Sequence, residues 1–316
     1  MNIVLHGGEP LLAGPDLLTD LIEGLVSTAG RDRIKLHVQT NGVLLTESIC
    51  AVLDRFDVKV GVSLDGDEAA NAARVDHRGR ESWHGTIQGL NLLQRGTPHL
   101  FGGLLCVVNP LSDPRAVMTT LLNFHPPVLD LLQPFITHEM VDEDSRATVR
   151  RFGQWMIDAT DVWLTNPSWH GTRVRFAEDA MKATAGVKPK SDWFGQRGVT
   201  YLIVETDGRY DLQDQLKVLG GASSAIRAMS GSALDMPIAM AYEEARKRAD
   251  ILRINELPDG CAECRWKVGC AGGFAPTRFS VASGFNNPST FCGSLQEYFQ
   301  YLAPLMAARS LPSPLT

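Results

Sequence analysis

Four cysteines in the last fifth of the chain have a spacing that suits metal chemistry. Cys261, Cys264, Cys270 and Cys292 form the pattern C-x2-C-x5-C-x21-C. Four thiolates at such spacing can bind one tetrahedral metal ion or one iron–sulfur cluster, and soft sulfur ligands select these over magnesium or calcium. The spacing alone leaves zinc and iron–sulfur open, and the remaining alternative is four free, buried thiols.

The composition is that of an ordinary globular protein. The 316 residues are enough for about two domains, and 44% of them are hydrophobic while 21% are charged. The net charge of −6 and the lack of a basic stripe argue against nucleic acid and anionic membranes as partners. No apolar run reaches the length of a transmembrane helix, so we expect no membrane partner.

The start of the chain and the remaining cysteines indicate a compartment. Met1 is followed at once by the strand-like residues 2–5, without the segments of a signal peptide, so a cytoplasmic location is expected. In a reducing compartment, clustered cysteines are metal ligands rather than disulfides. Cys50 and Cys106 lie in apolar patterns, and we expect both in the core.

The first 135 residues alternate short apolar runs with amphipathic segments. Five runs are strand candidates, and apolar residues at helical spacing follow each of the first four. The candidates cover residues 3–5, 34–38, 58–62, 104–108 and 128–132. Repeated βα steps predict an α/β fold with a parallel sheet and crossover helices. A barrel or partial barrel fits this pattern, and an open doubly wound sheet is the main alternative.

Polar or glycine-containing residues follow every strand candidate. These clusters begin at or next to His6, Gln39, Ser63, Asn109 and Gln133. The carboxyl ends of parallel strands form the active face in such folds, so the five clusters are expected to converge on one rim. Ordinary loop chemistry is the alternative for any single cluster.

The rest of the chain has a different character. A helix face with large aromatic side chains and a polar stretch after it predict a helical connection over residues 141–195. From residue 196 a second unit is predicted, with a hairpin around Asp207-Gly208 and a charged helix over about 238–254. We therefore expect domains at 1–140, 141–195 and 196–316, the last of which contains the four cysteines.

Five short motifs stand in the order of one known enzyme group. They are HGGEP at 6–10, QTNG at 39–42, SLDG at 63–66, N-x2-R at 71–74 and a cysteine run that ends in GFNNPSTFC at 284–292. This order resembles radical S-adenosylmethionine enzymes with a SPASM-type auxiliary domain, and most closely the peptide maturases of the cyclophane-forming kind. The resemblance covers most of residues 3–110 and 196–295. It implies a partial (β/α) barrel of the radical S-adenosylmethionine type, followed by a small cysteine-rich SPASM-like domain.

The resemblance also implies roles for particular residues. Gly7, Gly8 and Glu9 would bind the amino group of S-adenosylmethionine, and the glycines suit this because no Cβ blocks their backbone. Ser63 and Arg74 would bind its ribose and carboxylate, with which a guanidinium pairs bidentately. The four cysteines would hold an auxiliary [4Fe-4S] cluster. The plainer alternatives are a Gly-Gly turn beside a surface glutamate and a solvated arginine.

The sequence departs from this enzyme group before the GGEP motif. It contains no C-x3-C-x2-C loop, which in the group precedes GGEP and holds the cluster that cleaves S-adenosylmethionine. We therefore expect no turnover from the chain as printed. It is either a longer enzyme truncated of its first βα unit or a decayed homologue, and the opening strand without lead-in favours truncation.

A second departure follows the Asp207-Gly208 turn, where many SPASM domains have a cysteine. Here the run is RYDLQD at 209–214, so we expect at most one auxiliary cluster. Asp211 and Asp214 can serve as an oxygen ligand or a general base. The alternative is that both are solvated carboxylates of a hairpin.

The sequence leaves three functions open. The first is a radical S-adenosylmethionine maturase that cross-links side chains of a ribosomally synthesised precursor peptide. The second is an inactive homologue that binds a peptide or protein partner and keeps the four cysteines as a structural metal site. The third is an unrelated α/β enzyme with a zinc ribbon, against which the motif order speaks. Metal content separates the third from the first, and an in-frame C-x3-C-x2-C upstream of Met1 would restore the active enzyme.

Overall fold

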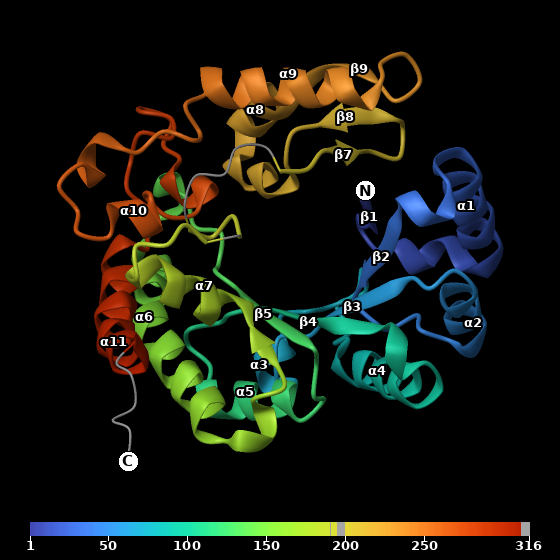
Figure 1. Ribbon diagram of the computed structural model, residues 1–316, viewed down its shortest axis with the longest axis horizontal. Coiled ribbons are helices and arrows are strands. Elements are labelled where there is room, and N and C mark those ends of the chain that lie inside the picture. Colours follow the sequence, from blue (N-terminus) through green and yellow to red (C-terminus); the bar gives the residue numbers. More distant parts are fainter. Residues whose placement is uncertain (190, 195–199, 311–316) are drawn as a thin grey trace. The chain divides into compact units, whose positions relative to one another are not determined.

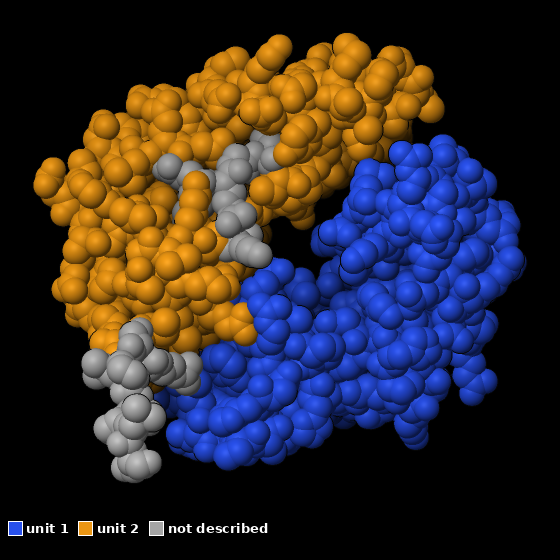
Figure 2. Space-filling model, in the orientation of Figure 1, with its two compact units in different colours: residues 1–132, 158–175 blue, residues 133–157, 176–316 orange. Residues whose placement is uncertain are grey.

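The computed structural model describes residues 1–189, 191–194 and 200–310 of the chain. The chain divides into two compact units (Figure 2). Unit 1 comprises residues 1–132 and 158–175, and unit 2 comprises residues 133–157 and 176–316. The predicted boundary between the connection and the second domain, at residues 195 and 196, lies outside the described residues.

Unit 1 is built on one parallel sheet of six strands, which confirms the predicted α/β class (Figure 1). The strands are β1 (Asn2–Leu5), β2 (Lys35–Thr40), β3 (Lys59–Ser63), β4 (Phe101–Val107), β5 (Val128–Leu132) and β6 (Arg173–Val174). They pair in chain order, whereas a doubly wound sheet reverses its order at a switch point. The uninterrupted order is that of a partial barrel, so the doubly wound alternative is wrong.

The predicted strands agree with the observed ones except at the end of the sheet. The first five observed strands each overlap one predicted run. Strand β6 falls inside the segment that was predicted to be a helical connection. Its two residues are too few to give the alternating pattern from which a strand can be recognised.

Helices connect the strands of unit 1 (Figure 1). They are α1 (Gly14–Ala29), α2 (Glu47–Arg55), α3 (Glu68–Asn71), α4 (Trp83–Gly96) and α5 (Pro114–Leu122). Three of them begin at a side-chain cap: Thr46 Oγ1 accepts from Ile49 N–H at 3.3 Å, Asp67 Oδ1 from Ala70 N–H at 3.0 Å, and Asp113 Oδ1 from Arg115 N–H at 3.0 Å. Such caps satisfy backbone donors that the first turn leaves unpaired, and each contributes about 1 kcal/mol.

The two faces of β3 have different roles. Val60 and Val62 are completely buried, as are Leu53 of α2 and Leu90 of α4, so the core of unit 1 includes this face. Burying a side chain of this kind contributes about 1.5–3 kcal/mol. Because side chains alternate along a strand, Ser63 lies on the opposite face, together with the rim described below.

Unit 2 contains a chain of packed aromatic rings. The rings lie on or next to the helices α6 (Glu143–Thr165, of which residues up to 157 belong to this unit), α7 (Arg175–Thr184, of which residues from 176 belong to it) and α11 (Cys292–Ser310). Phe152 of α6 packs on Phe291 and on Phe176, with ring centroids 5.2 and 5.8 Å apart. The final helix, α11, begins at Cys292 and has 19 residues. Among the described helices of the chain, none is long and apolar enough to cross a bilayer.

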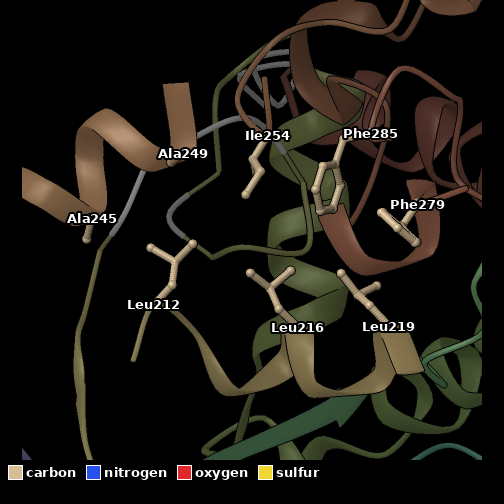
Figure 3. Packing of buried hydrophobic residues seen from close by; sticks show 8 residues of the cluster. All are labelled: Leu212, Leu216, Leu219, Ala245, Ala249, Ile254, Phe279 and Phe285. Atoms are coloured by element: carbon tan, nitrogen blue, oxygen red, sulfur yellow. The ribbon is translucent and has the colours of Figure 1, made fainter. Parts of the chain in front are cut away.

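The hairpin region, residues 200–254, forms one part of unit 2. It contains the antiparallel strands β7 (Ile203–Val204), β8 (Arg209–Asp211) and β9 (Ala228–Ser232), the 3-10 helix η6 (Asp214–Ala222), and the helices α8 (Ser223–Arg227) and α9 (Ile238–Ile251). Figure 3 shows Leu212, Leu216 and Leu219 facing the alanines of α9 and the ring of Phe285. This apolar cluster joins the hairpin region to the segment that contains the cysteines.

The cysteine region, residues 258–299, is built from short turns before it enters α11. Its elements are η7 (Asp259–Cys261), α10 (Lys267–Cys270) and η8 (Ala275–Arg278). Ala271 has a φ of 50° and Gly272 a φ of 89°, so the chain turns sharply after α10. A Cβ on Gly272 would lie 2.8 Å from the ring of Pro258, so both conformation and space require glycine there.

Candidate functional site

Glu9 lies at the rim of unit 1, where strands β1 and β2 end. Its Oε1 accepts hydrogen bonds from Thr40 Oγ1 at 2.7 Å and from Leu11 N–H at 3.0 Å, and its Oε2 accepts from Asn41 N–H at 2.8 Å. The carboxylate therefore ties the two strand ends together and is not a solvated surface group. A carboxylate offers about four lone-pair positions, so one acceptor position is left for a ligand.

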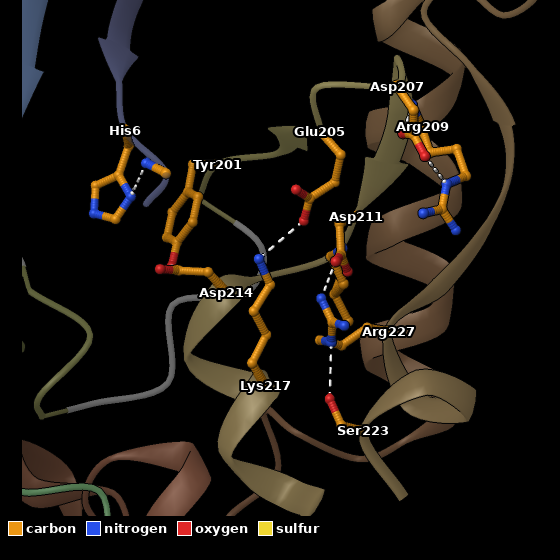
Figure 4. A network of polar contacts seen from close by, with 12 residues as sticks. His6, Tyr201, Glu205, Asp207, Arg209, Asp211, Asp214, Lys217, Ser223 and Arg227 are labelled. Carbon is orange, nitrogen blue, oxygen red and sulfur yellow. Dashed lines mark hydrogen bonds and ion pairs between the residues drawn. The ribbon is translucent and has the colours of Figure 1, made fainter. Parts of the chain in front are cut away.

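The two glycines before Glu9 have open surroundings. Gly7 has a φ of 134°, and its N–H donates to His6 Nδ1 at 2.7 Å (Figure 4). A Cβ on Gly7 or Gly8 would meet no atom within 4 Å, so the backbone is accessible there. A ligand can therefore approach the carbonyl groups of this turn closely.

Ser63 at the end of β3 is held by Gln39 of β2. Gln39 Nε2 donates to Ser63 Oγ at 2.9 Å. Gln39 pairs in register with Gly61, and a Cβ on Gly61 would lie 2.2 Å from Gln39 Oε1, so glycine makes room for the amide. Because Ser63 Oγ accepts in this bond, its own hydroxyl proton remains available to donate to a ligand.

Arg74 is engaged within the chain. Its Nε and Nη2 donate to the two carboxylate oxygens of Asp65 at 2.5 and 2.8 Å, and Asp65 Oδ1 also accepts from Val107 N–H at 2.8 Å. The two side chains are 27% and 12% exposed, so Arg74 is not a solvated surface arginine. Two of its five N–H donors are used in this pair, and the others can reach a ligand carboxylate.

The other predicted rim residues have different positions. Asn41 Oδ1 accepts from Val43 N–H, and Asn109 Oδ1 accepts from Leu111 N–H, so both side chains stabilise turns. Gln133 directly follows β5 and is buried, so it stands at the carboxyl end of that strand. Glu9, Ser63 and Arg74 are thus each held by a neighbouring side chain of unit 1, namely Thr40, Gln39 and Asp65 respectively.

The four cysteines line one pocket in unit 2. Cys261 ends η7, Cys270 ends α10 and Cys292 begins α11, while Cys264 lies between the two short helices. The other residues that line the pocket include Lys267, Gly272, Gln296 and Phe299. Three of the cysteines therefore lie at helix ends and the fourth lies in the turn between two short helices, and this arrangement places all four around one pocket.

The thiols affect one another's ionisation. Burial, with the charges of Cys292 and Cys261, raises the pKa of the Cys270 thiol to about 12. Burial, Cys292 and Cys264 also raise the pKa of Cys261, which the Arg278 guanidinium lowers. Four thiolates therefore repel one another in this pocket unless a cationic group lies among them.

Arg278 lies behind the wall of the pocket and is almost completely buried, at 1% exposed. Its guanidinium donates to the carbonyl oxygens of Phe285 at 2.7 Å, Ile254 at 3.0 Å and Glu256 at 2.8 Å. Burial lowers its pKa to about 10, while Cys261 and Cys270 raise it. The sequence motif includes this arginine, but its backbone contacts join residues too far apart for the sequence to reveal them.

The carboxylates of the hairpin region form ion pairs (Figure 4). Asp211 is buried and pairs with Arg227, and Arg227 Nε donates to Ser223 Oγ at 2.9 Å. Burial raises the pKa of Asp211, and Arg227 opposes this rise. Asp214 Oδ1 accepts from Tyr201 Oη–H at 3.1 Å. The interpretation of Asp211 as a solvated hairpin carboxylate is therefore wrong, because Arg227 of α8 covers it.

Sequence reasoning missed one polar neighbour of the cysteines. Gln296 Nε2 donates to Cys292 Sγ at 3.2 Å. The two residues are four positions apart on α11 and therefore lie on the same face of the helix. Their spacing could have revealed the contact only if the helix had been predicted to begin at Cys292.

Comparisons with known proteins identify relatives along nearly the whole chain. No protein-family model matches it. A serine-type anaerobic sulfatase-maturating enzyme of Klebsiella aerogenes is 25% identical over 96% of this chain and 73% of its own length. A cysteine-type anaerobic sulfatase-maturating enzyme of Clostridium perfringens is 23% identical over 96% of this chain and 81% of its own length.

A solved structure has the same fold. The structure of native anSMEcpe with bound AdoMet and Kp18Cys peptide matches with a TM-score of 0.82 and 20% identity, over 98% of this chain and 84% of that chain. The partial barrel with a SPASM-like domain, predicted from the motif order, is thereby confirmed as the fold. The cyclophane-forming subtype is not confirmed. The chain is a homologue of the anaerobic sulfatase-maturating enzymes, which are radical S-adenosylmethionine maturases with a SPASM-type domain.

Proposed function

We propose that this chain is the scaffold of a radical S-adenosylmethionine maturase that cross-links side chains of a ribosomally synthesised peptide. The observation that carries the proposal is the pocket lined by Cys261, Cys264, Cys270 and Cys292, in a chain whose relatives are maturases over nearly its whole length. The bound cofactors supply the radical chemistry, and the chain binds, orients and shields them. The proposed domains are the barrel at 1–140, a connection at 141–195 and the SPASM-like domain at 196–316.

An iron–sulfur cluster fits the cysteine pocket better than zinc does. Around one zinc ion, four thiolates lie about 2.3 Å from a common centre, which puts all four sulfurs in close contact. Within the described residues, no three cysteine, histidine or acidic side chains stand close enough to share a single ion. The four thiols nevertheless line one pocket, as expected when each binds a different iron of one [4Fe-4S] cluster.

The rim of unit 1 supports binding of S-adenosylmethionine. Gly7 and Gly8 would offer backbone carbonyls, and Glu9 its remaining acceptor position, to the cationic amino group. The Ser63 hydroxyl would bind the ribose, and the outer N–H groups of Arg74 the carboxylate. Asp65 would orient Arg74, since it already holds one edge of the guanidinium.

A peptide is the partner that the neighbours suggest. The anSMEcpe structures contain the Kp18Cys or the Cp18Cys peptide together with AdoMet. A partner of this kind agrees with the net charge of −6, which disfavours nucleic acid. We propose a cytoplasmic location, because a cluster held by thiolates and a ribosomal precursor peptide both suit a reducing compartment.

Maturation of a sulfatase is the second candidate function. It is favoured by the serine-type and cysteine-type sulfatase-maturating relatives, each matched over 96% of this chain. Co-expression with a sulfatase distinguishes the two candidates. Gain of sulfatase activity would favour this candidate, whereas an unchanged sulfatase and a cross-linked peptide would favour the first.

Anaerobic purification with iron, sulfide and zinc counted per chain tests the cluster. About four irons with four sulfides would support one auxiliary [4Fe-4S] cluster. One zinc without sulfide, persisting after reconstitution with iron and sulfide, would contradict it and leave a structural metal site.

Equilibrium dialysis with labelled S-adenosylmethionine tests the rim. We expect the chain as printed to bind the cofactor without cleaving it, because the sequence has no C-x3-C-x2-C loop. Ser63→Ala should weaken binding about tenfold, as the loss of one hydrogen bond to a ligand would. Ser27→Ala, an exposed serine on α1, is the matched control. Equal affinity of both variants would contradict the role of Ser63.

Mass spectrometry of a co-expressed precursor peptide tests the cross-link. The gene is expressed with any in-frame coding sequence upstream of Met1 included. A cross-link between two side chains removes two hydrogen atoms and prevents fragmentation between the joined residues. A peptide of unchanged mass, from a protein that carries its clusters, would contradict the proposed reaction.

A further inference from the structure

Gln296 is placed to donate a hydrogen bond to one ligand of the proposed cluster. Its Nε2 lies 3.2 Å from Cys292 Sγ, and its side chain lines the cysteine pocket. Gln296 is half-buried on α11, one helical turn after Cys292, so the helix fixes both residues relative to each other. The amide is therefore held against the sulfur by secondary structure.

Arg278 places a positive charge behind Gly272, one of the residues that line the pocket. A Cβ on Gly272, which lines the pocket, would lie 3.5 Å from Arg278 Nε, so only the backbone of Gly272 separates the guanidinium from the pocket. Among the described residues, the guanidinium donates to the carbonyl oxygens of Phe285, Ile254 and Glu256, and no carboxylate forms an ion pair with it. Its charge is thus fixed in position but not neutralised.

The other cation at the pocket is less effective. Lys267 lines the pocket, but it is exposed, and its Nζ donates to the carbonyl oxygen of Ala262 at 2.6 Å. Exposed charges are screened by water and salt, whereas a charge at 1% exposure acts through a low dielectric. Of these two cations, Arg278 therefore has the charge that solvent screens least.

A cluster held by four thiolates carries net negative charge, and reduction adds one more electron. Positive charges and hydrogen bonds to the sulfurs stabilise the reduced form more than the oxidised form, and so raise the reduction potential. We propose that Gln296 and Arg278 are positioning residues that raise the reduction potential of the cluster bound by the four cysteines. This inference rests on the cluster in the proposed function, and it does not depend on which peptide is modified.

The experiment is a reductive titration of the anaerobically reconstituted full chain, followed by absorbance and by electron paramagnetic resonance. Gln296→Leu removes the donor and keeps the bulk of the side chain. A hydrogen bond to a charged acceptor contributes about 1.5–3 kcal/mol, and only the part that differs between the oxidised and reduced clusters changes the potential, so the equilibrium for reduction should fall by up to about tenfold. For one electron this is a shift of up to about 59 mV to lower potential.

Matched variants separate electrostatics from folding. Gln300→Leu makes the same substitution at an exposed position of α11 and should leave the potential unchanged. Gln296→Glu puts a negative charge beside Cys292 and should lower the potential further than Gln296→Leu. Arg278→Lys keeps the charge and should lower the potential less than Arg278→Gln. Where the Arg278 variants fail to fold, the Gln296 series decides.

The outcomes are distinct. Iron and sulfide at the level of the unmodified chain, with potentials in the order given, would support the inference. The same metal content with an unshifted potential in Gln296→Leu and Gln296→Glu would overturn it and leave the proposed function intact. An equal shift in Gln300→Leu would also overturn it. Zinc without sulfide in the unmodified chain would overturn both the cluster and this inference.

Discussion

The hairpin region and the cysteine region of unit 2 are stabilised in different ways. The hairpin region supplies most of an apolar cluster around Leu216 and Ala245, both completely buried, and it also has ion pairs such as Asp211–Arg227. Before α11 begins, the cysteine region consists of helices of three or four residues, and its largest fully buried side chain is the charged Arg278. We therefore expect the first region to hold its shape mainly by packing, and the second to depend more on a bound group that brings the thiols together.

The difference shows that one small domain can combine two sources of stability. Short turns such as α10 close few hydrogen bonds and are marginal by themselves. At metal sites, the free energy of binding becomes free energy of folding, because the unfolded chain offers no preformed ligand set. We therefore expect the two regions to respond differently to metal removal and to mutation.

Removing one thiol should have the largest effect. Cys264→Ala should cost most of the bound metal and about 3–5 kcal/mol of the free energy of unfolding of unit 2, since metal binding and folding are coupled. Metal analysis and hydrogen exchange check this, with protection lost in the cysteine region before the hairpin region. Cys106→Ala, at a completely buried position of β4, should leave the metal content unchanged. Unchanged metal and melting in Cys264→Ala would contradict the four-cysteine site.

A cavity in the apolar cluster should have the next largest effect. Leu216 is completely buried between the hairpin strands and α9, so Leu216→Ala should cost about 2–4 kcal/mol. Denaturant unfolding with and without reconstituted metal measures this cost. Leu234→Ala, at a side chain that is 89% exposed, is the control and should have little effect. A cost for Leu216→Ala that disappears when metal is bound would mean that the two regions are not independent.

The sequence predicted the parts of this molecule that local patterns determine. The first five strands were recognisable because apolar runs end in polar clusters. The four cysteines were recognisable because their spacing is typical of metal ligands. The order of the motifs predicted the fold, which the likeness to anSMEcpe confirms. The cyclophane-forming subtype, which the motif order suggested, is not confirmed by relatives that are sulfatase-maturating enzymes.

The remaining features depend on contacts between residues far apart in the sequence. Nothing near Glu9 indicates that Thr40 and Asn41 would bind its carboxylate, or that Gly61 would make room for Gln39 beside Ser63. The same holds for Arg278, whose carbonyl partners begin 24 residues before it. Strand β6 was missed for a different reason, because two residues show no periodicity.

Breaking the Asp211–Arg227 pair should give a moderate effect that depends on pH. Arg227→Met leaves a buried carboxylate without its cation and should cost about 2 kcal/mol at neutral pH, below the range for fully buried pairs because both side chains keep some exposure. Burial already raises the pKa of Asp211, and losing Arg227 raises it further. A carboxyl whose pKa is higher in the folded state stabilises folding at low pH and loses this contribution as pH rises through that pKa.

The variant should therefore fall further below the unmodified protein as pH rises above about 4, the ordinary value for aspartate. Denaturant unfolding at several pH values measures the difference. The double variant Asp211→Asn with Arg227→Met has no carboxyl at this position, and its stability should lack the pH dependence that Asp211 causes. A constant deficit in Arg227→Met alone would mean that Asp211 stays ionised without its partner.

Removing an exposed ion pair should have the smallest effect. It tests whether surface charges contribute to the stability of the hairpin region. Glu205 Oε1 lies 2.9 Å from Lys217 Nζ, with side chains 33% and 49% exposed, and Lys217 lowers the pKa of Glu205. Solvent screens such pairs, so Glu205→Gln should cost less than about 1 kcal/mol at low salt and nothing measurable at high salt. Glu243→Gln, which removes an exposed pair with Arg246 inside α9, is the matched control and should behave alike. A larger, salt-independent cost for Glu205→Gln would show that the hairpin region depends on its charges as well as on its apolar cluster, and the contrast with the cysteine region would then be one of degree.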